Sequence, residues 1–273
     1  MSVSIDDRLR ETACAFDSVA PFYDGPFGNG AAIQHMREVL WREVATVTPP
    51  PARLLDLGCG TGLDAVHFAS VGYEVVAIDS SPEMAARARA RAAATGWSAR
   101  ITVRELGIHR LDELQDGIFD ALYSDLGPLN CLPDLAAAVR HCARLLPPGG
   151  RLVASVIGRW CPREIAHYLL RGHPRRALLR LRPGVVPVGL NGHTVSTRYW
   201  TPRGFAAVFA PCFSVRAFHT LALFAPPPYL ARRQGADLGS WHRFLAALDD
   251  KVGGWPLLRS AGDHFLITLV RRG

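Results

Sequence analysis

The chain has 273 residues, of which 49% are hydrophobic and 20% are charged, and its formal net charge is +7 at pH 7. This composition is typical of a globular protein with a sizeable core, and the positive charge is almost all arginine, which we do not take as evidence for nucleic-acid binding. The six cysteines form no CxxC pair, so neither a zinc site nor a disulfide framework is expected. The N-terminus lacks a signal pattern, which disfavours secretion, and no run of about 18 apolar residues occurs, which disfavours a membrane span. A cytoplasmic enzyme is therefore expected.

Residues 54–159 alternate β-rich runs with helical runs, which is the pattern of a parallel α/β sheet. The expected strands lie at 53–58, 73–81, 99–106, 117–127 and 149–158, and the expected helices at 63–72, 82–96 and 133–146. Because the strands are nearly continuous apolar runs, both faces of the sheet should be covered.

The pattern changes after Gly158. The remaining expected elements, in chain order, are an arginine-rich helical stretch at 161–184, a hairpin at 185–200 that turns at Asn191–Gly192, a helix at 201–211, a strand at 213–224, a proline-rich loop at 226–228, a helix at 239–252 and a closing strand at 264–272. The core therefore carries two insertions, 160–200 and 226–262, and either of them could cover a site.

The stretch LLDLGCGTGLD, residues 54–64, places three glycines after the first strand, where open α/β sheets bind ligands. Its GxGxG spacing differs from the GxGxxG of dinucleotide sites, and it lacks the Lys-Ser/Thr of triphosphate loops. It does offer an acid before the turn, Asp56, and Asp79 follows the glycines by about 20 residues, a spacing from which a carboxylate reaches both hydroxyls of a ribose. A ribose-bearing cation without phosphate suits these acids, and S-adenosylmethionine is such a ligand.

Together with VVAIDSSPEM, FDALYSDLGPLN and LLPPGGRLV, this loop makes the chain resemble the class I S-adenosylmethionine-dependent methyltransferases over about residues 15–159. The segment FDSVAPFYDGPFG is similar to the one that folds over the cofactor in the branch that methylates quinones and other small metabolites. The resemblance implies a Rossmann-like, doubly wound α/β fold whose seven-stranded sheet has a reversed last strand. The implied parts are an N-terminal helical cover (1–50), a cofactor-binding core (51–159), a cap insertion (160–200) and a completion of the core (201–273) with the second insertion at about 226–262.

The resemblance also implies which residues contact the cofactor. The implied contacts are Tyr23, Asp56, Gly58 and Gly60 for the methionine portion, Asp79 for the ribose, Ser80 and Met84 for the adenine edge, and Ser124 and Asp125 for the floor near the sulfonium. No metal is expected.

One position departs from the family. Many relatives carry an acid after the third strand that accepts the adenine amino group, and this chain has Gly107 there. Backbone atoms of Gly107 and Ile108, or the side chain of Glu105, are candidates to replace that contact.

Methyl transfer from a sulfonium mainly requires alignment and exclusion of water, whereas a hydroxyl or carbon acceptor also needs a base. His193, beside the hairpin turn, and His167, on the insertion helix, are the candidate catalytic bases because their segments could cover the methyl group. His109 is a further candidate, and Tyr199 and Asn130 are candidates to orient an acceptor. For each histidine the simpler interpretation is a surface or core residue.

The sequence therefore predicts a methyltransferase for a small, hydroxylated aromatic or polyketide-like metabolite, with O-methylation favoured. Carbon methylation of a quinone-like ring is the nearest alternative, and a cofactor sensor without turnover is another. RNA methylation through the arginine-rich stretch is a third, although SDLGPLN lacks the Asn/Asp-Pro-Pro-aromatic tetrad of enzymes that methylate base amines, so a nucleic-acid partner is disfavoured. The acceptor and the oligomeric state stay open.

Overall fold

The computed structural model describes residues 4–25, 28–227, 230, 239–256 and 258–273. Within these residues, seven strands form one sheet in the order β3-β2-β1-β4-β5-β9-β8. The strands are β1 (Arg53–Leu57), β2 (Glu74–Asp79), β3 (Ile101–Glu105), β4 (Ala121–Ser124), β5 (Arg151–Ile157), β8 (Phe213–Leu221) and β9 (His264–Arg271). Because β9 pairs antiparallel with both β5 and β8, the predicted α/β sheet with a reversed last strand is confirmed.

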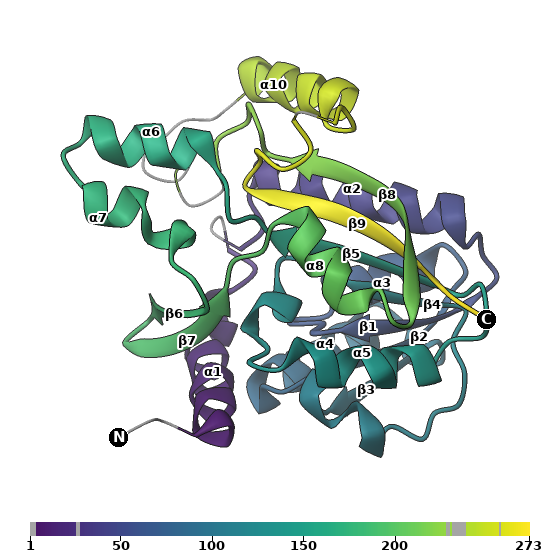
Figure 1. The fold of residues 1–273 in the computed structure, drawn as a ribbon. Coiled ribbons are helices and arrows are strands. Elements are labelled where there is room, and N and C mark those ends of the chain that lie inside the picture. The colour runs from purple at the N-terminus through teal and green to yellow at the C-terminus, as the bar shows by residue number, and fades with distance from the viewer. Residues whose placement is uncertain (1–3, 26–27, 228–229, 231–238, 257) are drawn as a thin grey trace.

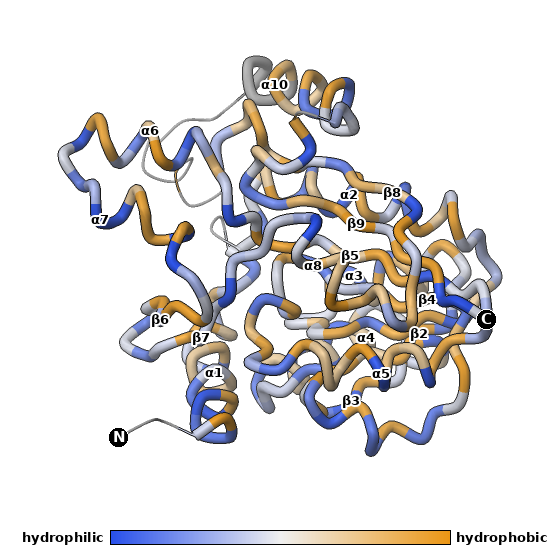
Figure 2. Tube along the Cα trace, viewed as in Figure 1, coloured by the Kyte–Doolittle hydropathy of each residue, from blue (hydrophilic) through white to orange (hydrophobic). Residues whose placement is uncertain are grey.

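Helices cover both faces of the sheet (Figure 1). One face carries α2 (Ala31–Val47), α3 (Leu63–Ser70) and α4 (Pro82–Ala94), and the other carries the 3-10 segment η2 (Ile108–Glu113), α5 (Leu135–Arg144) and α8 (Pro202–Phe209). Successive residues of a strand point to opposite faces, so Leu54 joins the first core and Leu55 the second. Figure 2 accordingly shows the central strands largely in hydrophobic colours.

The glycine loop is fixed by the close approach of two helices. Gly62 begins α3 at φ +80, and a Cβ there would lie 2.9 Å from the Cβ of Ala88 on α4. A side chain would therefore meet both backbone strain and a clash with a buried neighbour.

We expect Gly62→Ala to lower the free energy of unfolding by about 2–4 kcal/mol, measured by urea denaturation. Gly172→Ala is the matched control, because Gly172 has a similar φ of +72 but nothing within 4 Å of an added Cβ. The control should lose only the strain, about 1–2 kcal/mol. Equal losses in the two variants would show that the contact with Ala88 is not limiting.

The N-terminal cover and the cap insertion meet at one side of the sheet. The cover begins with α1 (Ile5–Val19) and η1 (Ala20–Phe22). The cap contains α6 (Pro162–Leu170), α7 (Pro174–Ala177), η4 (Leu179–Leu181) and the predicted hairpin of β6 (Val185–Leu190) and β7 (His193–Arg198). The hairpin lies beside α1 (Figure 1), where the amide of Thr194 donates to Glu11 Oε1 at 3.1 Å.

The arginine-rich stretch is not one amphipathic helix. Gly172, in the left-handed region at φ +72, ends α6, and Pro174 begins α7. Leu169 and Leu178 are each 50% exposed. Arg180, in contrast, is buried between Glu164 and Asp263, so it is not part of a solvated basic face.

The second insertion contacts both the cap and the core: its Leu230 packs against Tyr168 and Ala177 of the cap. Its helix α10 (Gly239–Val252) packs against α2 and β8, while 228–229, 231–238 and 257, including part of the predicted loop at 226–228, lie outside the described residues. No helix in the described part of the chain is long and apolar enough to cross a bilayer.

Candidate functional site

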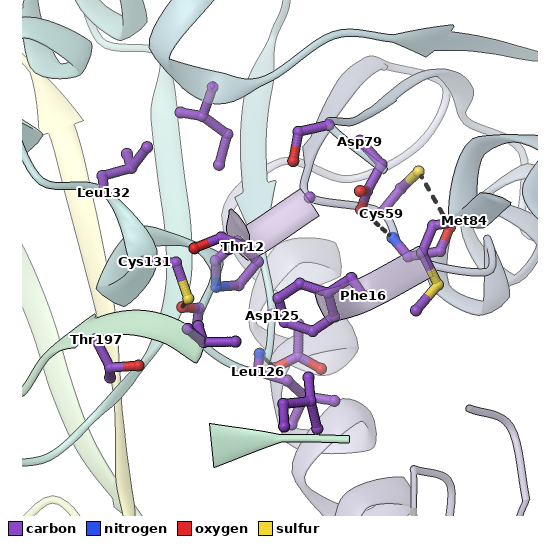
Figure 3. Close-up of a pocket in the computed structure, with 18 of the residues that line it drawn as sticks. Thr12, Phe16, Cys59, Asp79, Met84, Asp125, Leu126, Cys131, Leu132 and Thr197 are labelled. Atoms are coloured by element: carbon purple, nitrogen blue, oxygen red, sulfur yellow. Dashed lines mark hydrogen bonds between the residues drawn. The ribbon is translucent and has the colours of Figure 1, made fainter. Parts of the chain in front are cut away.

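A cavity of about 260 Å³ lies at the carboxyl ends of β1, β2, β4 and β5, beneath α1 and the hairpin. Figure 3 shows Cys59 of the glycine loop, Thr12 and Phe16 of α1 and Thr197 of the cap around it. The predicted contacts on its wall are Tyr23, Gly58, Gly60, Asp79, Ser80, Met84, Ile108 and Asp125. The sequence motifs and the segments that cover them therefore converge on one cavity.

Asp79 is held rigidly at the end of β2. Its Oδ2 accepts a hydrogen bond from the amide of Gly60 at 2.9 Å, and its Oδ1 accepts one from the amide of Ser81, also at 2.9 Å. Burial raises the pKa of Asp79, while the two amides act in the opposite direction by stabilising the carboxylate. Each carboxylate oxygen keeps a second lone pair, so the pair can accept from two vicinal hydroxyls.

Tyr23 covers the glycine loop. A Cβ on Gly60 would lie 3.8 Å from Cε1 of Tyr23, which places the ring against the loop. The following residue anchors it, because Asp24 accepts a hydrogen bond from the hydroxyl of Thr61 at 2.6 Å and is paired with Arg91. Burial raises the pKa of Tyr23 to about 12, so its hydroxyl is neutral at physiological pH.

Arg37, on α2, was not found by sequence reasoning. Its side chain lines the cavity, and its Nε lies 3.7 Å from Asp125 Oδ2 and 3.8 Å from Asp64 Oδ2. These separations exceed a hydrogen bond. Within the described residues, Arg37 Nε and Asp125 Oδ2 are buried and have no hydrogen-bond partner.

Asp125 is a buried acid on the cavity floor whose pKa is raised. Its Oδ1 accepts from the amide of Leu126 at 2.8 Å and from the hydroxyl of Ser155 at 2.6 Å. Burial and the nearby carboxylate of Asp64 raise the pKa of Asp125 to about 6, against the opposing effect of Arg37. A cation and an anion are therefore held side by side on the cavity floor, each with an unused hydrogen-bonding atom.

Three predicted cofactor contacts lie off the wall of this cavity. Asp56 is buried in β1, where burial and the carboxylates of Asp64 and Asp125 raise its pKa well above the ordinary range. Ser124 is fully buried and donates from its hydroxyl to the carbonyl of Leu57 at 3.0 Å. Gly107 lines a neighbouring hollow instead.

Neither predicted catalytic histidine lines the cavity. His193 is on β7, where its Nδ1 lies 3.4 Å from Glu11 Oε1 on α1. His167 is on α6, and its Nδ1 is 2.8 Å from Nη1 of Arg171. Other residues of the hairpin line the cavity instead, Val188 and Thr197 among them.

The candidates to orient an acceptor have structural roles. Asn130 is fully buried and donates from its amide to the carbonyls of Ile157 and Arg198, so it ties the cap to β5. Tyr199 lies beneath the guanidinium of Arg180, 5.4 Å from ring centroid to Cζ, and does not line the cavity. His109, by contrast, is on the wall.

Sequence reasoning also missed Asp64 and Thr12, which line the cavity. Asp64 follows the glycine loop directly, so its position could have been noticed. Thr12 is on α1, and its buried hydroxyl has no hydrogen-bond partner among the described residues. The sequence does contain a signal for Arg37. It is a charged residue within the apolar stripe of 31–47, and its neighbour Met36 is fully buried.

Comparison with known proteins agrees with this geometry. Residues 54–150 match the family described as a methyltransferase domain. The ubiquinone biosynthesis O-methyltransferase of Xanthomonas axonopodis pv. citri is 38% identical over 115 residues, which cover 42% of this chain and 47% of that protein. The protein of the same name from Xanthomonas oryzae pv. oryzae is 40% identical over 108 residues, or 40% of this chain and 44% of the relative. The chain thus matches less than half the length of these curated relatives.

Solved structures share the fold at low sequence identity. The CcbJ methyltransferase from Streptomyces caelestis has a TM-score of 0.63 and 18% identity, over 96% of this chain and 99% of that one. The 1,6-didemethyltoxoflavin-N1-methyltransferase of Burkholderia thailandensis, solved with S-adenosylhomocysteine, has a TM-score of 0.60 and 17% identity, over 100% of this chain and 92% of that one. Residues 54–150 therefore match the methyltransferase domain family, and the structure shares its fold with solved methyltransferases.

Proposed function

We propose that this protein transfers a methyl group from S-adenosylmethionine to a small hydroxylated metabolite, aromatic or polyketide-like, with oxygen as the acceptor atom. The observation that carries the cofactor is the pair of unused atoms on the cavity floor, Arg37 Nε and Asp125 Oδ2. Buried polar atoms in native proteins normally have partners, so this pair is complementary to a ligand with one carboxylate and one ammonium group. The amino-acid end of S-adenosylmethionine carries both.

The rest of the cavity fits the same ligand. Asp79 offers two fixed acceptors for a ribose, and Gly58 and Gly60 line the cavity next to it, where the chain between ribose and amino acid would pass. The bound cofactor supplies an activated methyl group on a sulfonium. Tyr23 and the hairpin exclude water from this region, and they hold the acceptor in line, which is the main contribution that a protein makes to such a displacement.

The acceptor class rests on the cap and on the named relatives. Hydrophobic residues line much of the cavity. They come from the cap and from the segment after β4 and include Leu132, Val188 and Val195, and Thr12 also lines the cavity. The curated relatives are O-methyltransferases of ubiquinone biosynthesis, which favours oxygen over carbon. Because a structure of this fold is the [4+2]-cyclase SpnF, with a TM-score of 0.61 and 18% identity, the reaction has to be measured.

The decisive experiment has two stages. Calorimetric titration with S-adenosylhomocysteine should show saturable binding, and its absence in the wild type would remove the cofactor from the proposal. Incubation with S-adenosylmethionine and a panel of phenols, hydroquinones and enolic polyketides should then give products heavier by one methylene. Products that resist cleavage of aryl methyl ethers would identify carbon methylation instead.

RNA methylation stays the alternative from a different class. The cap offers exposed arginines, Arg175 and Arg176, although the burial of Arg180 removes one member of the basic run. Salt-sensitive RNA binding with methylation of the RNA would support this alternative, and salt-insensitive or absent binding would remove it. A cytoplasmic location remains a prediction.

Cofactor binding should depend on the protonation of Asp125. As the pH rises through about 6, this carboxyl becomes the anionic partner of an ammonium group. We expect the affinity for S-adenosylhomocysteine, measured by calorimetry, to rise between about pH 5 and 7 and then level off, and Asp125→Asn to lack this step. Stability should respond in the opposite direction, because a carboxyl whose folded pKa is raised stabilises the fold only while it is protonated.

Arg37, Asp64 and His264 also face Asp125, so the comparison with Asp125→Asn is essential. Should the same step persist in that variant, the titration belongs to another group and the role of Asp125 is wrong.

A further inference from the structure

A side chain at position 107 would meet the imidazole of His109 in its present position. The φ of −78 and ψ of 149 at Gly107 are available to any residue, so the backbone does not require glycine. A Cβ at this position would lie 2.3 Å from Cε1 and 2.5 Å from Nδ1 of His109. The imidazole ring therefore occupies the space into which a side chain at position 107 would project.

His109 stands where the cavity meets the hollow that Gly107 lines, and it borders both. Neither of its ring nitrogens has a hydrogen-bond partner among the described residues. Burial and the positive charge of Arg110 lower the pKa of His109 against the opposing carboxylates of Asp6, Asp112 and Glu113. A neutral imidazole keeps one acceptor and one donor nitrogen.

The wall between Asp79 and His109 suits a flat heterocycle. The cavity lining here includes Ser80, the fully buried Met84, and Leu106 and Ile108, which are buried and apolar. A base attached to a ribose at Asp79 would enter this apolar section first. His109, which borders both the cavity and the neighbouring hollow, adds a polar ring to this apolar lining.

We propose that His109 accepts a hydrogen bond from the exocyclic amino group of the cofactor's adenine, in the place where relatives use an acid at position 107. This inference rests on the proposed function, because it names a contact to S-adenosylmethionine. It accounts for both the glycine at 107 and the unused ring nitrogens of His109. Glu105, the other side-chain candidate, lines only the neighbouring hollow.

The test compares S-adenosylhomocysteine with its 6-deamino analogue, in which a hydrogen atom replaces the exocyclic amino group of the purine. Calorimetry at about pH 7.5 should show that the wild type prefers the adenosyl compound by about 10-fold, the effect of one hydrogen bond to a polar group. His109→Ala should bind both compounds equally. Glu105→Ala is the matched control and should keep the wild-type preference.

A double variant examines the steric part of the proposal. With the imidazole removed, position 107 can carry a side chain, so Gly107→Asp combined with His109→Ala should restore the preference for the adenosyl compound. Gly107→Asp alone should bind both compounds poorly because of the clash with His109. Circular dichroism of each variant shows whether it is folded.

Retention of the preference by His109→Ala, or its loss in Glu105→Ala, would overturn the assignment to His109. Equal binding of both compounds by the wild type would overturn it as well. A wild type that binds neither compound would instead overturn the proposed function, so the two failures are distinguishable.

Discussion

Asp79→Asn is expected to weaken the binding of S-adenosylhomocysteine by about 100-fold at neutral pH. Both carboxylate oxygens accept from backbone amides, Gly60 for one and Ser81 for the other. An asparagine must present its NH₂ group to one of these donors, which repels that amide and moves the glycine loop. It also removes the anion and one of the two acceptors that a ribose would use, so the loop and the ligand lose stabilisation together.

Asp249→Asn is the matched control for this prediction. The carboxylate of Asp249 is also buried and held by backbone amides, those of Leu223, Phe224 and Ala225, but it lies outside the cavity. Its asparagine variant should lose stability while keeping the wild-type affinity within about twofold, as a distant site should. Affinity of Asp79→Asn within about threefold of the wild type would show that Asp79 does not hold the ribose.

Replacing Arg180 by methionine should lower the free energy of unfolding by about 3–5 kcal/mol, measured by guanidinium denaturation. Arg180 is 7% exposed, and its Nη2 lies 2.6 Å from Glu164 Oε2 and 2.5 Å from Asp263 Oδ1. Its Nη1 donates to the carbonyls of Gly158 and Asp263. Methionine fills much of the volume but leaves two buried carboxylates facing each other without a counter-charge.

Two comparisons separate charge from packing. Arg176→Met, on the exposed surface of the same segment, should change stability by less than about 0.5 kcal/mol. Adding Glu164→Gln to Arg180→Met should recover part of the loss, because one buried charge is removed. The deficit of Arg180→Met should also shrink below about pH 4, where the exposed carboxyls of the unfolded chain and the unpaired Glu164 and Asp263 all bind protons. A deficit that is constant with pH would mean that the loss comes from packing.

In the wild type, by contrast, the ion pair of Arg180 with Asp263 makes the protein less stable as the pH falls. Although burial alone would raise it, the pKa of Asp263 is held well below its usual range by Arg180 and His264. Its contribution to stability is therefore present above the ordinary carboxyl pKa and is lost only in strong acid.

The sheet could be predicted because its signals are local. Continuous apolar runs such as 74–79 and 151–157 are typical of strands covered on both faces, and they are β2 and β5. The hairpin was equally local, since Asn191 and Gly192 both adopt positive φ at the predicted turn. The residues that form the glycine loop and Asp79 lie within one βαβ unit, so a motif could identify them.

The rest of the site depends on distant parts of the chain. Arg37 comes from a helix before the sheet, and only the folded topology brings it to Asp125. The burial of Arg180 depends on Asp263, which lies 83 residues away. His193 and His167 belong to the insertion that borders the cavity, but which residues of that insertion reach the cavity is set by how the hairpin packs on α1, and no local pattern contains that information.

The hydrogen bonds between α1 and the hairpin can form only after most of the chain has been synthesised. The hydrogen bonds that join them connect Asn191 to Ser18 and Thr194 to Glu11, pairs that are 173 and 183 residues apart. Helix α1 is synthesised well before the hairpin and must therefore wait for much of the chain before it finds its partner, and closing so long a loop is among the slower steps of folding. A nascent chain that ends before residue 185 already has the glycine loop and Asp79, but it has nothing to hold α1 over them from the cap side. Tight retention of the cofactor is thus a property that the protein acquires late, after its sheet has begun to form.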